Sequence, residues 1–189
     1  MEQDGDMKEE EHGKRGKAVR ESVSFILYLI VIVVLTFLMI RYVGQRTRVD
    51  GSSMENTLTN GDNLIVDKIS YRFHEPERFD IIVFPYQYKE DTYFIKRIIG
   101  MPGETVQITD KGEILIDGEE LVESYGREVI KDPGLASDPI TLGEDEYFVM
   151  GDNRLRSTDS RELGPFTIDD FVGMKGLVIY PFTDIQWID

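Results

Sequence analysis

The stretch "VSFILYLIVIVVLTFLMI", from Val23 to Ile40, divides the chain into two parts of different character. None of its residues is charged, and at 1.5 Å per residue it forms a helix of about 27 Å, close to the hydrocarbon thickness of a bilayer. A buried core helix of this length normally keeps a polar face. The apolar part of a cleaved signal peptide is shorter and ends at a small-residue site. The stretch therefore predicts one uncleaved transmembrane helix over residues 22–43.

The residues before this helix are polar. Residues 1–21 hold seven acids and five bases, and their low hydrophobicity predicts a disordered tail. Four bases stand close before the helix (Lys14, Arg15, Lys17 and Arg20) and three stand at or just after its end (Arg41, Arg46 and Arg48). This bias favours a cytoplasmic amino terminus, which would place residues 44–189 outside the cytoplasm.

From residue 49 onward, short β-branched and aromatic runs alternate with Gly, Pro and Asp, a pattern typical of strands and turns. Strands are expected at "NLIVDKISY" (63–71), "DIIVFPY" (80–86), "TYFIKRIIG" (92–100), "ETVQIT" (104–109), "GEILID" (112–117), "EYFVMG" (146–151) and "GMKGLVIYPF" (173–182). Turn signals make Thr105–Ile116 a hairpin. Helical periodicity is missing except for a possible turn near "TIDDFVG", and Val122–Pro139 is a long excursion or flap. The predicted fold class is mainly β: a single transmembrane helix followed by a largely antiparallel β-sheet domain.

Composition excludes several kinds of site. The chain has no cysteine, which rules out disulfides and thiolate chemistry. The histidines His12 and His74 are too few for most histidine-built metal sites. The net charge of -15 argues against nucleic acid as a partner. No metal or other cofactor is expected.

The stretch "GSSMENTL", Gly51 to Leu58, places two adjacent serines shortly after the helix. A serine is a poor nucleophile unless a base takes its proton. His12 lies in the tail and His74 lies in a polar connection, so neither is a plausible base. A lysine can serve if burial makes it neutral near pH 7.

Lys96, in "YFIKRIIG", has the most apolar surroundings of the lysines. Strand alternation places it on one face with Phe94 and Ile98, and Arg97 on the other. The pattern alone does not decide which base points inward. Both side chains could instead extend from the sheet toward water.

A third stretch, "GDNRLRSTDSRELGP" from Gly151 to Pro165, is dense in side chains that hydrogen-bond to one another. One interpretation is a turn held by local side-chain bonds and an Asp–Arg pair. The other is a group of residues that positions a base.

In this order, "GSSMENTL", "RFDIIVF", "FIKRIIGMPGE" and "GDNRLRSTDSR" resemble the sequence boxes of bacterial type I signal peptidases. The resemblance extends from the membrane helix to about Gly176 and is greatest to the compact Gram-positive type. It implies a membrane-anchored serine peptidase domain over residues 44–189.

The resemblance also implies roles for individual residues. Ser53, the serine before methionine, corresponds to the nucleophile and Lys96 to the general base. Ser157 corresponds to the serine that hydrogen-bonds and orients the lysine. Asp159 and Arg161 match a structural pair beneath the site.

Further expectations concern the surroundings of Ser53. Some relatives have a hydroxyl in the oxyanion hole where this chain has Gly51, so the backbone N–H of Ser53 would be the main donor. The resemblance also implies a substrate pocket lined by Val49, Met54, Leu58, Phe94 and Ile95. Asn56 stands where the family usually has proline, and its side chain could hold a similar turn.

The implied reaction is removal of signal peptides from exported preproteins after small residues of the Ala-x-Ala type, at the membrane and beside the export translocon. Rival interpretations are a self-cleaving repressor of the SOS type, a non-catalytic membrane-anchored β-domain that binds partners, and an enzyme dedicated to pilins or another subset. The self-cleaving repressor would need a DNA-binding or self-cleavage segment, and the chain has neither. The C-terminal aromatics Phe182 and Trp187 could touch lipid, or Trp187 could belong to the core of a closing strand.

Overall fold

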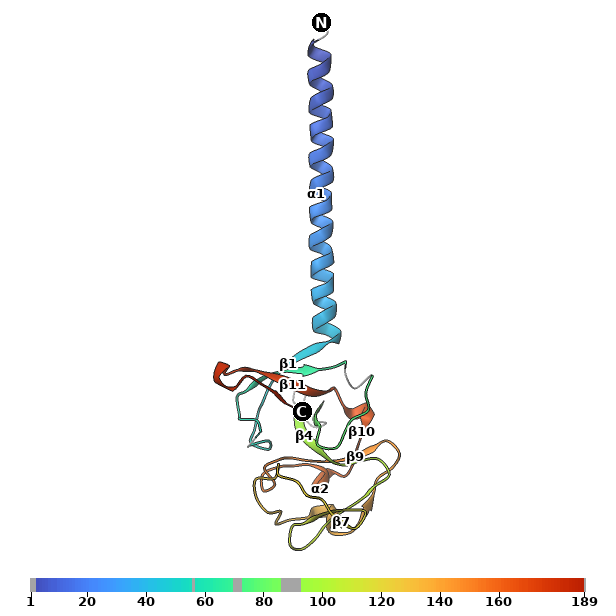
Figure 1. The fold of residues 1–189 in the computed structure, drawn as a ribbon, viewed down its shortest axis with the longest axis vertical. Coiled ribbons are helices and arrows are strands. Elements are labelled where there is room, and N and C mark those ends of the chain that lie inside the picture. The colour runs from blue at the N-terminus through green and yellow to red at the C-terminus, as the bar shows by residue number, and fades with distance from the viewer. Residues whose placement is uncertain (1–2, 56, 70–72, 86–92, 189) are drawn as a thin grey trace. The chain divides into compact units, whose positions relative to one another are not determined.

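The structure is a computed structural model that describes residues 3–55, 57–69, 73–85 and 93–188. It consists of two compact units, Met1–Tyr42 and Val43–Asp189. The first is a single helix and the second is built from strands (Figure 1). This division follows the change of composition at the end of the apolar stretch.

Helix α1 spans Gln3–Tyr42. Among the described residues it is the one helix that is long and apolar enough to cross a membrane. The candidate span is Arg20–Met39, and none of it is buried. The helix also includes most of the tail that was predicted to be disordered. The Glu, Lys and Arg residues that make up much of residues 8–20 have high helix propensity, and disorder of the tail stays a prediction.

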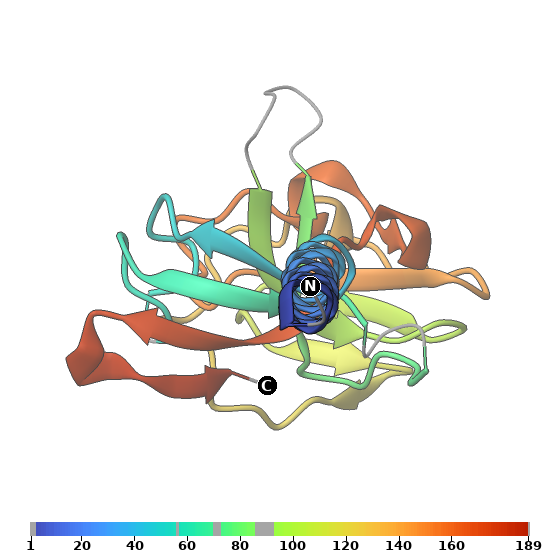
Figure 2. The ribbon, with the colours of Figure 1, turned by 90° about the horizontal axis from the view of Figure 1, so that it is seen from above.

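The second unit contains a large antiparallel sheet of eight strands. The order is β1-β2-β11-β3-β4-β9-β10, and β12 pairs with β11. Its strands are β1 (Gly44–Arg48), β2 (Asn63–Asp67), β3 (Ile81–Pro85), β4 (Tyr93–Gly100), β9 (Glu146–Met150), β10 (Phe166–Thr167), β11 (Gly173–Tyr180) and β12 (Gln186–Ile188). Each of its pairings is antiparallel, which confirms the predicted fold class. Figure 2 shows the hairpin of β11 and β12, in red, beside β2.

A smaller antiparallel sheet has the order β7-β6-β5-β8. Its strands are β5 (Thr105–Ile108), β6 (Ile114–Ile116), β7 (Glu119–Glu120) and β8 (Ile140–Thr141). The pairing of β5 with β6 confirms the predicted hairpin. In Figure 1 β7 lies at the opposite end of the domain from β1 and β11. The remaining elements are the short helix α2 (Ser160–Leu163) and the 3-10 turns η2 (Gly134–Ser137), η3 (Ile168–Asp170) and η4 (Phe182–Asp184).

The strands that the sequence pattern missed are short or polar. β1 has the sequence GQRTR and therefore shows no alternation of hydrophobic residues. It is recognised as a strand only by its antiparallel pairing with β2. At the carboxyl end β12 does close the sheet, but Trp187 is 72% exposed and Ile188 is the buried residue. The interpretation of Trp187 as a core residue is therefore wrong, because strand alternation turns it to the outer face.

Strand β4 lies inside the sheet and is buried on both faces. Its three isoleucines Ile95, Ile98 and Ile99 belong to three different hydrophobic clusters. Lys96 and Arg97 stand between these isoleucines, and each is only 2% exposed. Burying a charged group costs free energy unless it is paired or neutral, so this strand forces both bases to find partners inside the protein.

Candidate active site

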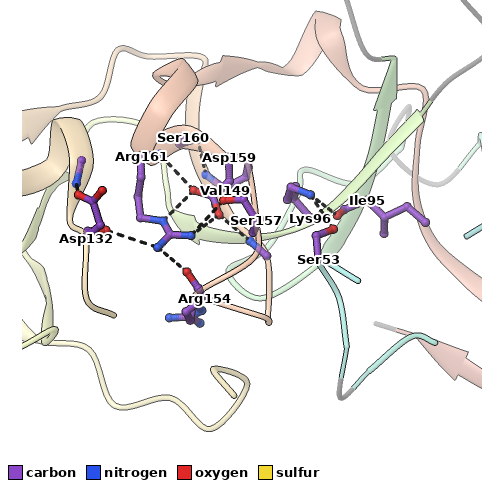
Figure 3. A network of polar contacts seen from close by, with 12 residues as sticks. Ser53, Ile95, Lys96, Asp132, Val149, Arg154, Ser157, Asp159, Ser160 and Arg161 are labelled. Carbon is purple, nitrogen blue, oxygen red and sulfur yellow. Dashed lines mark hydrogen bonds and ion pairs between the residues drawn. The ribbon is translucent and has the colours of Figure 1, made fainter. Parts of the chain in front are cut away.

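Lys96 and Ser53 meet although 43 positions separate them in the chain. The Lys96 Nζ lies 2.9 Å from Ser53 Oγ and donates to the Ile95 carbonyl at 3.2 Å. Figure 3 shows the amine directed at the serine hydroxyl. No basic side chain among the described residues hydrogen-bonds the neighbouring hydroxyl of Ser52, so the geometry distinguishes the two serines.

The surroundings of Lys96 favour its neutral form. Burial lowers the pKa of the Lys96 amine from 10.5 to about 8. Asp159 and Asp152 oppose this decrease in the pKa, whereas Arg161 adds to it. An amine with a pKa near 8 is roughly one-tenth neutral at pH 7, and only the neutral amine can accept a proton.

The loop that follows β9, residues 151–159, holds the turn that carries Ser53. The backbone N–H of Asn153 donates to the Ser53 carbonyl at 3.0 Å. Gly151 packs so closely that a Cβ on it would lie 2.5 Å from Ser53 O and 2.3 Å from Ser157 Oγ. Only glycine fits at this position, which explains why the loop begins with Gly.

Asp159 and Arg161 form a buried, bidentate ion pair beneath this loop. Arg161 Nε and Nη2 each lie 2.9 Å from an oxygen of Asp159. Asp159 also accepts the backbone N–H of Gly151 at 3.1 Å, and Arg161 donates to the Arg154 carbonyl at 2.8 Å. The pair thus connects both ends of the loop (Figure 3), and its two charges act on the pKa of Lys96 in opposite directions.

Ser157 differs from expectation. Its Oγ is buried and has no hydrogen-bond partner among the described residues, so the expected bond to Lys96 is not formed. The Lys96 amine donates to the Ile95 carbonyl and contacts Ser53 Oγ instead. A lysine ammonium has three N–H donors, so one donor is left after these two contacts.

Arg97 points to the opposite side of the strand from Lys96 and forms a second buried ion pair. Its Nε and Nη2 lie 3.0 Å from the two carboxylate oxygens of Asp152, and Thr57 Oγ1 donates to Asp152 at 2.5 Å. Tyr125 stacks on the guanidinium, with the Arg97 Cζ 3.7 Å from the ring centroid. Neither base of β4 extends toward water. Sequence reasoning missed this cluster, although two oppositely charged residues in the quoted motifs were a signal for it.

A cleft of about 210 Å³ lies beside Ser53 and Lys96. Four of the five predicted pocket residues line it: Val49, Met54, Phe94 and Ile95. Leu58 does not, because it is 1% exposed and packs in the hydrophobic core. Polar residues that were not predicted also line the cleft, among them Asp50, Ser52, Arg156 and Thr158.

The backbone N–H of Ser53 has no acceptor among the described residues. Gly51 has a φ of 111°, a conformation that favours glycine, and its N–H donates to Asn60 Oδ1 at 3.1 Å. The Gly51 N–H is therefore already used, whereas the Ser53 N–H remains available. Asn56 lies outside the described residues.

Metal-binding groups were searched for among the described residues, and no cluster of three or more His, Asp or Glu side chains was found there. The expectation of no cofactor stays a prediction.

Comparison with known proteins identifies the family. Residues 21–180 match the family described as signal peptidase, peptidase S26. The chain belongs to the signal peptidase family.

Individual signal peptidases are similar over most of the chain. Signal peptidase I P of Bacillus subtilis subsp. natto is 37% identical over 166 residues, covering 84% of this chain and 88% of the relative. Signal peptidase I T of Bacillus subtilis (strain 168) is 38% identical, covering 83% and 85%. A solved signal peptidase I from Enterococcus faecalis V583 is 34% identical and covers 53% of this chain and 96% of that chain, with a TM-score of 0.44. The two Bacillus sequence matches confirm the resemblance to Gram-positive type I signal peptidases that the four motifs indicated.

Proposed function

We propose that the protein is a membrane-bound serine endopeptidase that removes amino-terminal signal peptides from exported preproteins after small residues. The observation that carries the proposal is the 2.9 Å contact between Ser53 Oγ and a buried lysine amine. Burial brings the pKa of that amine to about 8. A hydroxyl beside a partly neutral amine is the arrangement that a Ser-Lys peptidase needs.

In the proposed reaction Ser53 Oγ attacks the scissile carbonyl and neutral Lys96 accepts its proton. The Ser53 N–H stabilises the oxyanion of the tetrahedral intermediate. The intermediate collapses to an ester on Ser53, and Lys96 returns the proton to the leaving amine. Neutral Lys96 then takes a proton from water, which hydrolyses the ester and regenerates the serine.

We assign Ser157 a role in orienting Lys96. After the contacts to Ser53 and Ile95, one N–H of the lysine is left, and the buried Ser157 hydroxyl lacks a partner among the described residues. A hydrogen bond between the two groups would satisfy both, and an unmade buried hydrogen bond is costly. Asp159 and Arg161 would hold the loop that carries Ser157.

The cleft supports selectivity for small side chains. It is small and has an apolar lining formed by Val49, Met54, Phe94 and Ile95. β9 begins to pair with β4 at Arg97, so the part of β4 near Ile95 lies beyond that pairing. An extended preprotein segment could add there as a strand.

The anchor supports the same function. Helix segment Arg20–Met39 would span the bilayer with the tail in the cytoplasm and the catalytic domain outside. Ser53 lies thirteen positions after Ile40, a reach of at most about 45 Å. This tether would keep the nucleophile near the face where a translocated preprotein emerges, beside the export translocon.

The proposal predicts that the two adjacent serines behave differently. Full-length protein in detergent or vesicles should cleave a preprotein with an Ala-x-Ala site, and Ser53→Ala should lower kcat/KM on the order of 10⁴-fold or more. Ser52→Ala is the matched control and should retain cleavage within about tenfold, because Lys96 contacts Ser53. Loss of cleavage only in Ser52→Ala would contradict the assignment.

A further inference from the structure

The peptide group between Ser52 and Ser53 is held by a side chain that the proposed reaction does not use. Asn153 is 3% exposed, and its Nδ2 donates to the Ser52 carbonyl at 3.0 Å. The Glu55 N–H donates to the same carbonyl at 3.2 Å. The backbone N–H of Asn153 holds the next carbonyl, that of Ser53, at 3.0 Å.

This peptide group contains the proposed oxyanion donor. The bond between Ser52 and Ser53 is trans, since the one cis bond found among the described residues joins Tyr180 and Pro181. In a planar trans peptide the N–H points opposite to the C=O. Whatever fixes the direction of the Ser52 carbonyl therefore fixes the direction of the Ser53 N–H.

The bonds to the Ser52 carbonyl also affect the strength of the donor. A carbonyl that accepts hydrogen bonds polarises its peptide group, which makes the N–H a better donor. No described residue accepts the Ser53 N–H, so this donor remains available to a substrate. The contacts thus prepare a donor whose direction is set before the substrate binds.

The orientation of the Asn153 amide is itself fixed by chemistry. Its Nδ2 contacts the Ser52 carbonyl and also Glu55 Oε2, at 3.3 Å. Both partners can only accept hydrogen bonds, so the NH2 group must face them. Glu55 is in turn paired with Arg127 at 2.6 Å.

We propose that Asn153 is a positioning residue for the oxyanion hole: its side-chain amide orients the Ser52–Ser53 peptide so that the Ser53 N–H points at the developing oxyanion. The inference rests on the proposed function. Asn153 touches no reacting atom and acts through the backbone of the nucleophile. A purely structural link between the loop and the serine turn is the rival explanation.

The test compares Asn153→Leu with the wild-type protein on a peptide substrate and on two inhibitors of the same peptide sequence. One inhibitor is a peptide aldehyde, which forms a tetrahedral adduct with Ser53 and needs the oxyanion hole. The other is the corresponding peptide alcohol, which forms no adduct and does not need it. Removing an oxyanion donor costs about 10²–10³ in kcat, and misdirecting one should cost about 10- to 100-fold. We expect that decrease in kcat and in aldehyde affinity, while KM and alcohol affinity change by less than about threefold.

Two further variants keep the result interpretable. Asn153→Asp keeps the size of the side chain but has no N–H for the Ser52 carbonyl, so it should lose at least about 10- to 100-fold in kcat and in aldehyde affinity. It replaces Asn153→Leu in the test if the leucine variant does not fold. Asn60→Leu removes another asparagine contact to this turn, the one to the Gly51 N–H, and should leave kcat within about threefold.

An unchanged kcat in an active, folded Asn153→Leu protein would overturn the inference. Equal losses of aldehyde and alcohol affinity, or an equal loss in Asn60→Leu, would show a merely structural link. A wild-type protein that does not cleave would instead refute the proposed function, so the two failures are distinguishable.

Discussion

Lys96→Met is expected to abolish preprotein cleavage and, at pH 7, to raise the free energy of unfolding. Cleavage is lost because methionine cannot accept the Ser53 proton. Stability rises because the wild-type protein must hold a buried amine whose pKa falls from 10.5 to about 8 on folding. At 1.36 kcal/mol for each tenfold change in proton affinity, this burden is at most about 3 kcal/mol, before the lost contacts to Ser53 and Ile95 are subtracted.

The effect on stability depends on pH. The unfolded wild-type chain keeps its Lys96 proton up to about pH 10.5, whereas the folded protein loses it near pH 8. Unfolding therefore takes up a proton between these values, and the wild-type protein becomes more stable as the pH rises through that range. The advantage of Lys96→Met should be largest below pH 8 and decrease toward pH 10.5.

Denaturant unfolding of both proteins at several pH values, together with a cleavage assay, measures both effects. Lys111→Met makes the same substitution at an exposed lysine and should change neither cleavage nor the pH dependence of stability. A Lys96→Met protein that cleaves at the wild-type rate would refute the base assignment. A constant stability difference from pH 7 to 10.5 would refute the account of the buried amine.

Asp159→Asn and Arg161→Met are expected to shift the pH–rate profile in opposite directions. The base must be neutral, so wild-type kcat/KM should rise with pH and reach half of its plateau near pH 8. Asp159 raises the pKa of Lys96 and Arg161 lowers it. Asp159→Asn should therefore move the rise to lower pH, and Arg161→Met should move it to higher pH.

The same two variants should both lose stability. Each leaves a buried charge without its partner, and breaking a buried ion pair in this way costs about 3–5 kcal/mol. The measurement is kcat/KM from pH 6 to 10 for each folded variant, with denaturant unfolding beside it. Glu162→Gln changes an exposed carboxylate next to Arg161 in helix α2 and should alter neither the pH–rate profile nor the free energy of unfolding. Shifts in the same direction for both variants would contradict the electrostatic account.

Much of this arrangement follows from patterns local in the sequence. The uncharged run predicted the helix, and the β-branched and aromatic run around Ile98 predicted a strand, whose alternation places Lys96 and Arg97 on opposite faces. The motifs then singled out Ser53, because composition alone could not choose between two adjacent serines. Local patterns were sufficient here because each feature depends on neighbouring residues.

Other features depend on contacts between distant segments and could not be predicted. The resemblance implied that Leu58 lines the pocket, but its side chain packs in the core. The partner of Arg97 is Asp152, 55 positions away, and only the folded sheet brings them together. The Ser157 hydroxyl lacks the expected bond to Lys96, and a sequence motif does not determine which rotamer a side chain adopts.

The central claim is that Ser53 is a nucleophile activated by neutral Lys96. It is tested most directly by trapping the acyl-enzyme with an Ala-x-Ala peptide ester, quenching with acid and locating the adduct by fragmentation mass spectrometry. The account predicts an acyl group on Ser53, formed faster as the pH rises through about 8, and little adduct in Lys96→Met. An acyl group on Ser52, or a wild-type rate of acylation in Lys96→Met, would contradict it.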